Sequence, residues 1–241
     1  TTQGFLLSKK ILGKEEIEKI KNELTITPLQ ENPDLPTKPP VFAYKESEWH
    51  ISVPRYYGYK KFGKEINNKI SGGLKIDKEH LKFEGTPRDD QYKALEKIAD
   101  GITKYNGGIL ELPTGWGKTF VALWLIISIG KKALIVSNRR NIMQHWEEEI
   151  QKFTPLLRMG KLGNGKREVQ DRDVVVASLQ TIALSDLESE MFTEFGVVIY
   201  DEIQTVPCQQ FSRSFKKVMC KYMFGMSGSP DRKDGMHILS E

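Results

Sequence analysis

Residues 112–119 read Leu-Pro-Thr-Gly-Trp-Gly-Lys-Thr, a glycine-containing turn followed by lysine and threonine. An apolar strand-like run, 108–112, leads into it, and an apolar helix is expected over 118–129. Glycines at a strand-to-helix turn allow backbone N–H groups to converge on phosphate oxygens, and the positive N-terminus of the new helix faces the same point. We therefore expect a nucleoside triphosphate here, with Lys118 at its β- and γ-phosphates and Thr119 on Mg²⁺. The other candidate nucleotide-binding residues of the loop are Pro113, Thr114, Gly115, Trp116 and Gly117.

The loop departs from the general pattern G-x-x-x-x-G-K-[ST] at its first position, where Leu112 replaces glycine. An ordinary glycine turn is the alternative interpretation. The strand before the loop and the helix after it favour phosphate binding.

Apolar strands and helices alternate on both sides of this loop. Upstream, apolar residues from 94 to 102 recur with helical spacing, and downstream a helix is expected with Trp146 and Ile150 on its apolar face. This alternation predicts an α/β fold in which a parallel sheet is covered by helices on both faces. Ligands bind such sheets at the carboxyl ends of the strands. The further expected strands are 133–137, 174–177, 197–200 and 223–226.

Two acidic residues follow one of these strands directly. The buried run 197–200 delivers Asp201 and Glu202 at its carboxyl end, and we expect this strand to neighbour the one that precedes the phosphate loop. Asp201 is then a candidate for holding the Mg²⁺ shell, and Glu202 for orienting and deprotonating an attacking water. Taken alone, a strand that ends in two solvated acids is the alternative, and the phosphate loop disfavours it.

Composition narrows the class of protein. The chain has 241 residues, of which 39% are hydrophobic, and this is enough for one or two folded domains. Its formal net charge of +4 suits a polyanionic partner but does not require one. Two cysteines without a C-x-x-C pair and four dispersed histidines argue against a disulfide framework and a zinc site. No apolar run reaches about 18 residues and no signal sequence opens the chain, so we expect a soluble, intracellular protein without a membrane partner.

The first 84 residues are expected to form a small α+β accessory domain. The pattern predicts a helix over 14–24, strand-like runs near 41–44 and 50–53, and a second amphipathic stretch over 64–70, with a proline-rich connector at 28–40. Residues 85–241 are then expected to form the nucleotide-binding domain.

One segment of the accessory domain, residues 55–64, interleaves cations with aromatic rings. This composition suits phosphate contact and base stacking. The alternative is that the rings pack inward and the lysines are merely solvated. The candidate nucleic-acid contacts of the segment are Arg55, Lys60, Lys61 and Lys64.

In their order along the chain, these motifs resemble the first motor domain of superfamily-two helicases, closest to the XPB-like and phage UvsW-like branch that includes viral transcript-release helicases. The resemblance covers about residues 87–235 and implies a RecA-like fold with ATP and Mg²⁺ as cofactors. It also accounts for Leu112, because this branch carries an LPTGxGKT version of the phosphate loop. The matching stretches are 87–91, 112–119, 133–146, 174–181, 200–207 and 224–235.

The resemblance implies roles for residues outside the phosphate loop. Gln91 is the expected reader of the adenine base, with Arg88 beside it. Gln204 joins Lys118, Asp201 and Glu202 as a catalytic candidate, but it stands where the family has histidine, and a solvent-facing amide without a role is the alternative. His145 likewise replaces the glutamine that usually precedes the motif Ia tryptophan. The residues expected to couple hydrolysis to movement are Ser227, Gly228 and Ser229, in place of the commoner Ser-Ala-Thr.

By the same resemblance, loops at the carboxyl ends of two strands are expected to contact the phosphates of a bound nucleic acid. Such backbone contacts give affinity without sequence preference, as a motor that steps along any sequence requires. The candidates are Asn138, Arg139, Arg140, Ser178, Gln180 and Thr181.

The leading functional hypothesis is an ATP-dependent DNA helicase or translocase, with DNA favoured over RNA and a monomer favoured over an oligomer. Motors that move duplex DNA without unwinding it share the same domain. The chain begins at Thr1 and ends soon after its last motif, so we expect a longer polypeptide with a second RecA-like domain. The alternative is a module that binds ATP and nucleic acid but turns over little without that second domain. A P-loop kinase is disfavoured because it leaves the later motifs unexplained.

Overall fold

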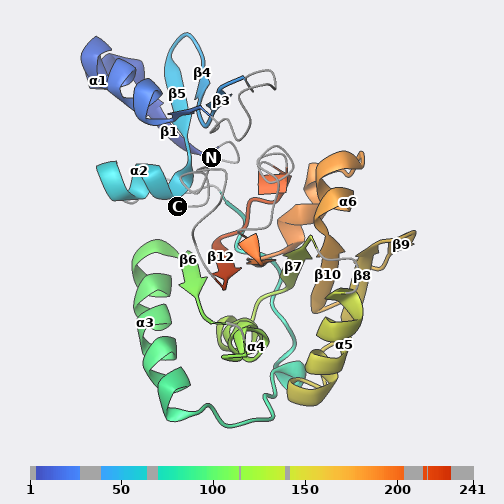
Figure 1. The fold of residues 1–241 in the computed structure, drawn as a ribbon. Helices are drawn as coiled ribbons and strands as arrows, with labels where there is room; N and C mark the ends of the chain where they lie inside the picture. The colour runs from blue at the N-terminus through green and yellow to red at the C-terminus, as the bar shows by residue number, and fades with distance from the viewer. Residues whose placement is uncertain are drawn as a thin grey trace, which may run out of the picture. The chain divides into compact units, whose positions relative to one another are not determined.

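The computed structural model describes residues 4–27, 39–63, 70–113, 115–138, 142–203, 214–215 and 217–228. These residues fall into two compact units, unit 1 within 4–63 and unit 2 within 70–228 (Figure 1). In the described ranges, no helix combines the length and the apolar character needed to cross a bilayer.

Unit 2 is built on a seven-stranded sheet, and all of its pairings are parallel except that between the last two strands. Its three central strands, at 133–137, 174–178 and 197–201, are mostly apolar and almost wholly buried, as expected of strands covered on both faces. The predicted α/β fold with a parallel sheet is therefore confirmed. In spatial order the strands are β6 (Gly107–Glu111), β12 (Tyr222–Ser227), β11 (Val197–Asp201), β7 (Ala133–Ser137), β10 (Val174–Ser178), β8 (Met159–Gly163) and β9 (Lys166–Arg167).

The strand order corrects one expectation. The sequence predicted that β11 would neighbour β6, but β12 lies between them and pairs with both. Chain order does not determine spatial order in a parallel sheet, because each crossover connection can pass over one or more strands. Gly225 of β12 leaves room for Ile203 beyond the end of β11, since a Cβ at Gly225 would lie 2.8 Å from Ile203 Cδ1.

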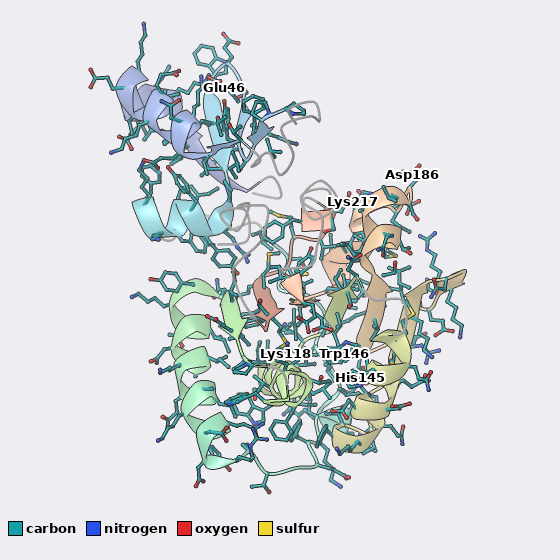
Figure 2. All side chains as sticks on the ribbon, viewed as in Figure 1. Glu46, Lys118, His145, Trp146, Asp186 and Lys217 are labelled. Atoms are coloured by element: carbon teal, nitrogen blue, oxygen red, sulfur yellow. The ribbon has the colours of Figure 1, made fainter. Side chains whose placement is uncertain are left out.

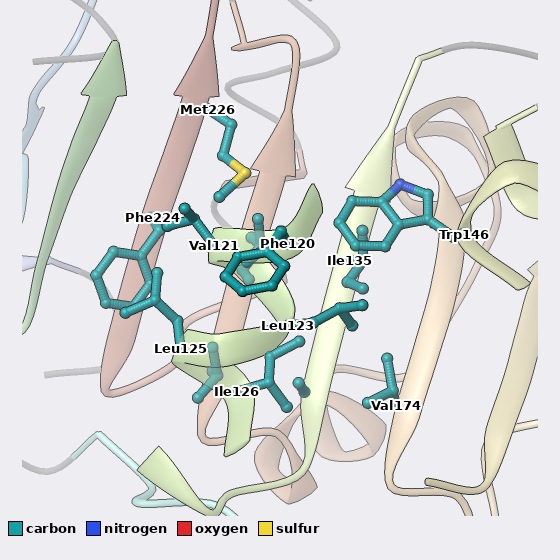
Figure 3. Close-up of a cluster of buried hydrophobic side chains, with 14 of the residues drawn as sticks. Phe120, Val121, Leu123, Leu125, Ile126, Ile135, Trp146, Val174, Phe224 and Met226 are labelled. Atoms are coloured by element: carbon teal, nitrogen blue, oxygen red, sulfur yellow. The ribbon is translucent and has the colours of Figure 1, made fainter. Parts of the chain in front are cut away.

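Three helices, α3, α4 and α5, cover one face of this sheet. Figure 3 shows part of the hydrophobic core that their side chains form with the side chains of the sheet. The fully buried side chains of α4 (Lys118–Ile129), among them Val121 and Leu123, belong to the same hydrophobic core cluster as Ile135 and Met226 of the sheet. Alternate strand residues, for example Leu134, are buried on the opposite face. The helices of unit 2 are α3 (Asp89–Tyr105), α4 (Lys118–Ile129), α5 (Ile142–Phe153) and the shorter α6 (Leu179–Leu184) and η2 (Ser189–Glu194).

Residues 70–84, here called the strap segment, run along the amino ends of the central strands. Leu74 N donates to Glu194 O at 2.8 Å, and Ile76 N donates to Gly130 O at 3.1 Å. Gly73 has a φ of +69°, and a Cβ there would lie 2.0 Å from the backbone nitrogen of Gly196. The strap segment, which includes η1 (Lys78–His80), thus belongs to unit 2 by its contacts, whereas the domain boundary at residue 84 stays a prediction.

Unit 1 is a small α+β unit. An antiparallel sheet in the order β1-β5-β4 packs with α1 and α2 around a core that contains Phe5, Ile20, Ile51 and Tyr59. The backbone of α1 kinks at Gly13, where φ is +73°. The amphipathic stretch expected at 64–70 lies almost wholly outside the described residues. The elements are β1 (Phe5–Ser8), α1 (Lys9–Glu23), β2 (Thr25–Ile26), β3 (Val41–Phe42), β4 (Lys45–Glu46), β5 (His50–Val53) and α2 (Arg55–Phe62).

Candidate nucleotide and nucleic-acid sites

The glycine loop begins directly after β6 and is fastened to the neighbouring strand. Leu112 is buried, and its N–H donates to the carbonyl of Ser227 at the end of β12 at 2.9 Å. Leucine at this position thus contributes to the core. Gly115 and Gly117 have φ values of +79° and +99°, in the left-handed region that favours glycine. Thr114 lies outside the described residues.

The first turn of α3 is bound to the loop through one carbonyl. Arg88 Nη2 and Gln91 Nε2 donate to Trp116 O at 2.8 Å and 3.0 Å. Gln91 is buried, and its Oε1 also accepts from Arg88 N at 3.0 Å in a capping box. The Arg88 guanidinium lies 5.8 Å from the centre of the Trp116 ring. The structure therefore brings the predicted base reader, Gln91, and its neighbour Arg88 to the glycine loop.

Lys118 and Glu202 form an ion pair, with 3.1 Å between Nζ and Oε1. Lys118 begins α4, which packs against the sheet, and Glu202 follows β11 with a φ of +52°. Their side chains retain only 13% and 11% of their accessible surface, and the preceding residue, Asp201, is buried. The predicted cation is thus brought together with Glu202, one of the two predicted acids, even though β12 lies between β6 and β11. Gln204 lies outside the described residues.

The residues next to Lys118 and Glu202 in the chain carry oxygen donors of the kind that bind Mg²⁺. Thr119 supplies a hydroxyl, and Asp201 supplies a carboxylate at the end of β11. Among the described residues, no three His, Cys, Asp or Glu side chains gather as a complete metal cage. Mg²⁺ is usually held by one or two carboxylates together with nucleotide phosphates, so the donor set fits Mg²⁺ bound with a nucleotide. The Thr119 hydroxyl lies 3.4 Å from Nε2 of His145 on α5.

Ser227 connects the predicted coupling motif to the loop. It is fully buried at the end of β12, and its carbonyl is the acceptor for Leu112 N. Gly228 follows it in a partly buried bend, whereas Ser229 lies outside the described residues.

The predicted nucleic-acid contacts at the carboxyl ends of β7 and β10 form one hydrogen-bonded group. Gln180 Nε2 donates to Asn138 Oδ1, joining the two strand ends. Ser178 caps α6 by accepting from Thr181 N at 3.3 Å, and its hydroxyl donates to Gln180 Oε1 at 3.0 Å. Arg139 and Arg140, which were predicted to add positive charge here, lie outside the described residues.

The hairpin that joins β8 to β9 was not among the sites predicted from the sequence. A Cβ at Gly163 would lie 2.9 Å from Thr181 Oγ1, so the hairpin begins beside the hydrogen-bonded residues just described, here called the strand-end group. The members of this group are Asn138, Ser178, Gln180 and Thr181. Asn164 has a φ of +53°, and Lys166 and Arg167 are exposed. The sequence signal for this hairpin is the Asn-Gly dipeptide within the Gly-Asn-Gly run at 163–165, because Asn-Gly is typical of tight hairpin turns.

In unit 1, the described side chains of the predicted cation and aromatic segment lie in different environments and do not form one exposed surface. Arg55 is buried, with its guanidinium 4.8 Å from the centre of the Tyr56 ring. Tyr59 belongs to the core, as in the inward-packing alternative. Lys60 is exposed, and Lys64 lies outside the described residues.

Lys61 is held by two carboxylates, at 2.9 Å from Glu16 and 3.2 Å from Glu23. Burial alone lowers the pKa of Lys61, but hydrogen bonds to Glu16, Tyr57 and Glu23 outweigh it and raise the pKa above its usual range. Nucleic-acid contact by this segment stays a prediction, and the ion pairs of Lys61 weaken the case for it.

Comparison with known proteins agrees with the motifs. Residues 84–232 match the family described as "Type III restriction enzyme, res subunit". The chain is 30% identical over 246 residues to "Putative ATP-dependent RNA helicase L396" of Acanthamoeba polyphaga mimivirus, covering 99% of this chain and 46% of that protein. It is 31% identical over 188 residues to "DNA 3'-5' translocase XPB2" of Sulfurisphaera tokodaii, covering 78% and 40%. The chain thus spans less than half the length of either relative.

Solved structures show the same fold. The UvsW helicase of bacteriophage T4 superposes with a TM-score of 0.64 at 17% identity, over 95% of this chain and 90% of that one. The Sulfolobus solfataricus SWI2/SNF2 ATPase core in complex with dsDNA superposes with a TM-score of 0.55 at 18% identity, over 66% and 36%. The predicted RecA-like fold is confirmed.

Proposed function

The chain belongs to the family described as type III restriction enzyme, res subunit, and we propose that it is the ATP-binding motor domain of an ATP-dependent helicase or translocase acting on DNA. The observation that carries the proposal is the 3.1 Å pair between Lys118 and Glu202. This pair places a phosphate-binding cation and a candidate general base on one site, as ATP hydrolysis requires.

Each residue of the site has a role in this proposal. The amide groups of 115–119 and the Lys118 ammonium bind the phosphates of ATP, while Thr119 and Asp201 hold Mg²⁺. Mg²⁺, when bound, neutralises charge on the phosphate oxygens. Glu202 orients the attacking water and accepts its proton, a role that typically contributes about 10²- to 10⁴-fold in rate.

Arg88 and Gln91 complete the nucleotide site on the side of α3. Both side chains donate to the carbonyl of Trp116, so the position of the loop and the position of the base-reading residues depend on each other. This dependence supports their assignment to the adenine base.

The strand-end group of Asn138, Ser178, Gln180 and Thr181 is proposed to contact the sugar–phosphate backbone. Its members are amides and hydroxyls, which donate to phosphate oxygens without reading bases. Support for DNA comes from the relative described as a DNA translocase and from the solved neighbour in complex with dsDNA. The mimivirus relative is described as an RNA helicase, so RNA is the alternative substrate.

A second candidate function is an ATP- and nucleic-acid-binding module with slow turnover. It is favoured by the lengths of the relatives, of which this chain covers 46% and 40%. A second RecA-like domain would supply arginines that stabilise charge on the transferring phosphoryl, a contribution of about 10³- to 10⁵-fold where such residues have been assessed.

The test compares ATP hydrolysis by the full-length protein in the presence of single-stranded DNA, duplex DNA, RNA or no nucleic acid. We expect stimulation that is strongest with DNA, and slow hydrolysis by residues 1–241 alone. Rates that no nucleic acid alters would contradict the motor proposal. Stimulation by RNA alone would overturn the preference for DNA while leaving the motor assignment standing.

A further inference from the structure

The Thr119 hydroxyl is bonded across to a neighbouring helix. Threonine hydroxyls in helices often donate to a carbonyl one turn earlier. For Thr119, the second residue of α4, the residue four positions earlier is Gly115 in the phosphate loop. The hydrogen bond that the structure records instead joins Thr119 Oγ1 to Nε2 of His145 on α5, at 3.4 Å.

The position of His145 follows from the packing of α5. Trp146 and Ile150 are buried in the core of unit 2, and the Phe153 ring contacts the Phe120 ring of α4 with 5.1 Å between centres. These contacts fix the rotation of α5 about its axis. They leave His145, which directly precedes Trp146, exposed and close to the first turn of α4. Figure 2 labels His145 together with Lys118 and Trp146.

His145 therefore contributes little to the core, and its recorded hydrogen bond is with a candidate Mg²⁺ ligand. We propose that His145 is a positioning residue for Mg²⁺: its Nε2 accepts the hydroxyl proton of Thr119, which directs a lone pair of Oγ1 toward the metal. The inference rests on the proposed function, because it assumes that Mg²⁺ and ATP occupy the phosphate loop.

The chemistry of the two groups sets this direction. A hydroxyl has one proton and two acceptor lone pairs, and only a lone pair can bind a metal. A neutral imidazole with its proton on Nδ1 presents Nε2 as an acceptor, so it holds the threonine proton away from the metal. His145 acts through Thr119 and is not itself a ligand, since Mg²⁺ prefers oxygen donors and keeps a compact octahedral shell. Groups that orient ligands in this way commonly change metal affinity by about 10- to 100-fold when removed.

Three variants of the full-length protein test the proposal. His145→Ala removes the acceptor, and His145→Gln restores one as an amide oxygen. Gln144→Ala is the matched control, because Gln144 is an exposed neighbour on α5 whose amide donates to Glu148 at 3.1 Å. ATP affinity is measured once with Mg²⁺ and once with EDTA, and the electron paramagnetic resonance spectrum of Mn²⁺ bound with ATP is recorded for each variant.

We expect His145→Ala to weaken ATP binding by about tenfold in Mg²⁺ and not at all in EDTA. It should also change the Mn²⁺ spectrum, while His145→Gln recovers most of the affinity and Gln144→Ala matches the wild type. Equal losses of ATP affinity in Mg²⁺ and in EDTA for His145→Ala would show a structural role and overturn the proposal. An ATP affinity that depends on Mg²⁺ as in the wild type would also overturn it. So would a His145→Gln variant that does not recover ATP affinity in Mg²⁺. If the wild type binds no ATP in either condition, the proposed function itself fails, which distinguishes the two failures.

Discussion

Lys118 Nζ lies 3.1 Å from Glu202 Oε1, which joins two residues that are 84 positions apart in the chain. Both side chains are mostly buried, so the pair is screened less by water than a surface salt bridge. ATP binding would give Lys118 phosphate oxygens as new partners and leave the Glu202 carboxylate available to a water. In the proposed function, hydrolysis would depend on this exchange of partners.

Replacing Glu202 by glutamine should separate binding from hydrolysis. The amide has no charge to compete for Lys118, so ATP affinity is expected to equal or exceed that of the wild type. It cannot accept a proton from water, so DNA-stimulated hydrolysis by the full-length protein should fall at least about 100-fold. Phosphate release measures hydrolysis and equilibrium titration measures ATP binding, with Glu190→Gln, at an exposed position on η2, as the control. Hydrolysis at the wild-type rate would remove Glu202 from the mechanism.

Removing the strand-end amides should weaken nucleic-acid binding without changing its salt dependence. Asn138→Ala and Gln180→Ala each remove neutral donors, so affinity should fall by a few-fold for every sequence.

The double variant Lys166→Ala with Arg167→Ala removes two cations and, if the β8–β9 hairpin contacts phosphates, should reduce the slope of log K against log salt by about 1.5. Binding titrations at four salt concentrations decide both points. Affinities unchanged in all variants would place the nucleic acid elsewhere.

Gly73→Ala should destabilise the protein through the strap segment. The new Cβ would lie 2.0 Å from Gly196 N, and the φ of +69° is unfavourable for alanine. Together these effects are expected to lower the free energy of unfolding by roughly 2–4 kcal/mol. Gly72→Ala is the matched control, because a Cβ there meets no heavy atom within 4 Å. Urea denaturation measures both, and equal midpoints for the two variants would show that the close approach of Gly73 to Gly196 is not required.

Asp173→Asn should reduce stability in a pH-dependent way. Asp173 is buried and accepts from Arg158 N at 2.8 Å and Arg158 Nη2 at 2.9 Å. Burial alone raises the pKa of Asp173, but the bonds from Arg158 outweigh it and lower that pKa. A folded-state pKa below the unfolded value adds stability above the unfolded pKa, and this contribution is lost as the pH falls through the folded pKa.

The wild type should therefore exceed the variant by about 1–3 kcal/mol in unfolding free energy at pH 7, with the gap closing below about pH 4. Asp171→Asn, at an exposed turn position, is the control. A gap that does not change between pH 7 and pH 3 would show that the charge of Asp173 is not the cause.

Local patterns in the sequence were sufficient to predict the strand, glycine turn and helix around residues 112–119 and the parallel sheet. Residues 112–119 carry a strand, a glycine turn and a helix within one short stretch, so their geometry depends mainly on nearby residues. The place of β12 between β6 and β11 could not be predicted in this way, because crossover connections allow several orders of equally apolar strands.

Contacts between distant residues were the other limit. The segment 55–62 has a composition suited to nucleic acid, yet Lys61 pairs with Glu16 and Glu23 of α1, which no local pattern reveals. The fit of Gly73 against Gly196 and the bond between Thr119 and His145 depend in the same way on tertiary packing.

The most direct test of the central claim is the affinity of Mg²⁺-ATP for Lys118→Ala, measured by calorimetry against the wild type and against Lys97→Ala, an exposed lysine of α3. Lys118→Ala is expected to lose at least about tenfold in affinity, the equivalent of one charged hydrogen bond, while Lys97→Ala should bind as the wild type does. Wild-type affinity in Lys118→Ala would contradict the assignment of residues 112–119 and of Glu202 to an ATP site.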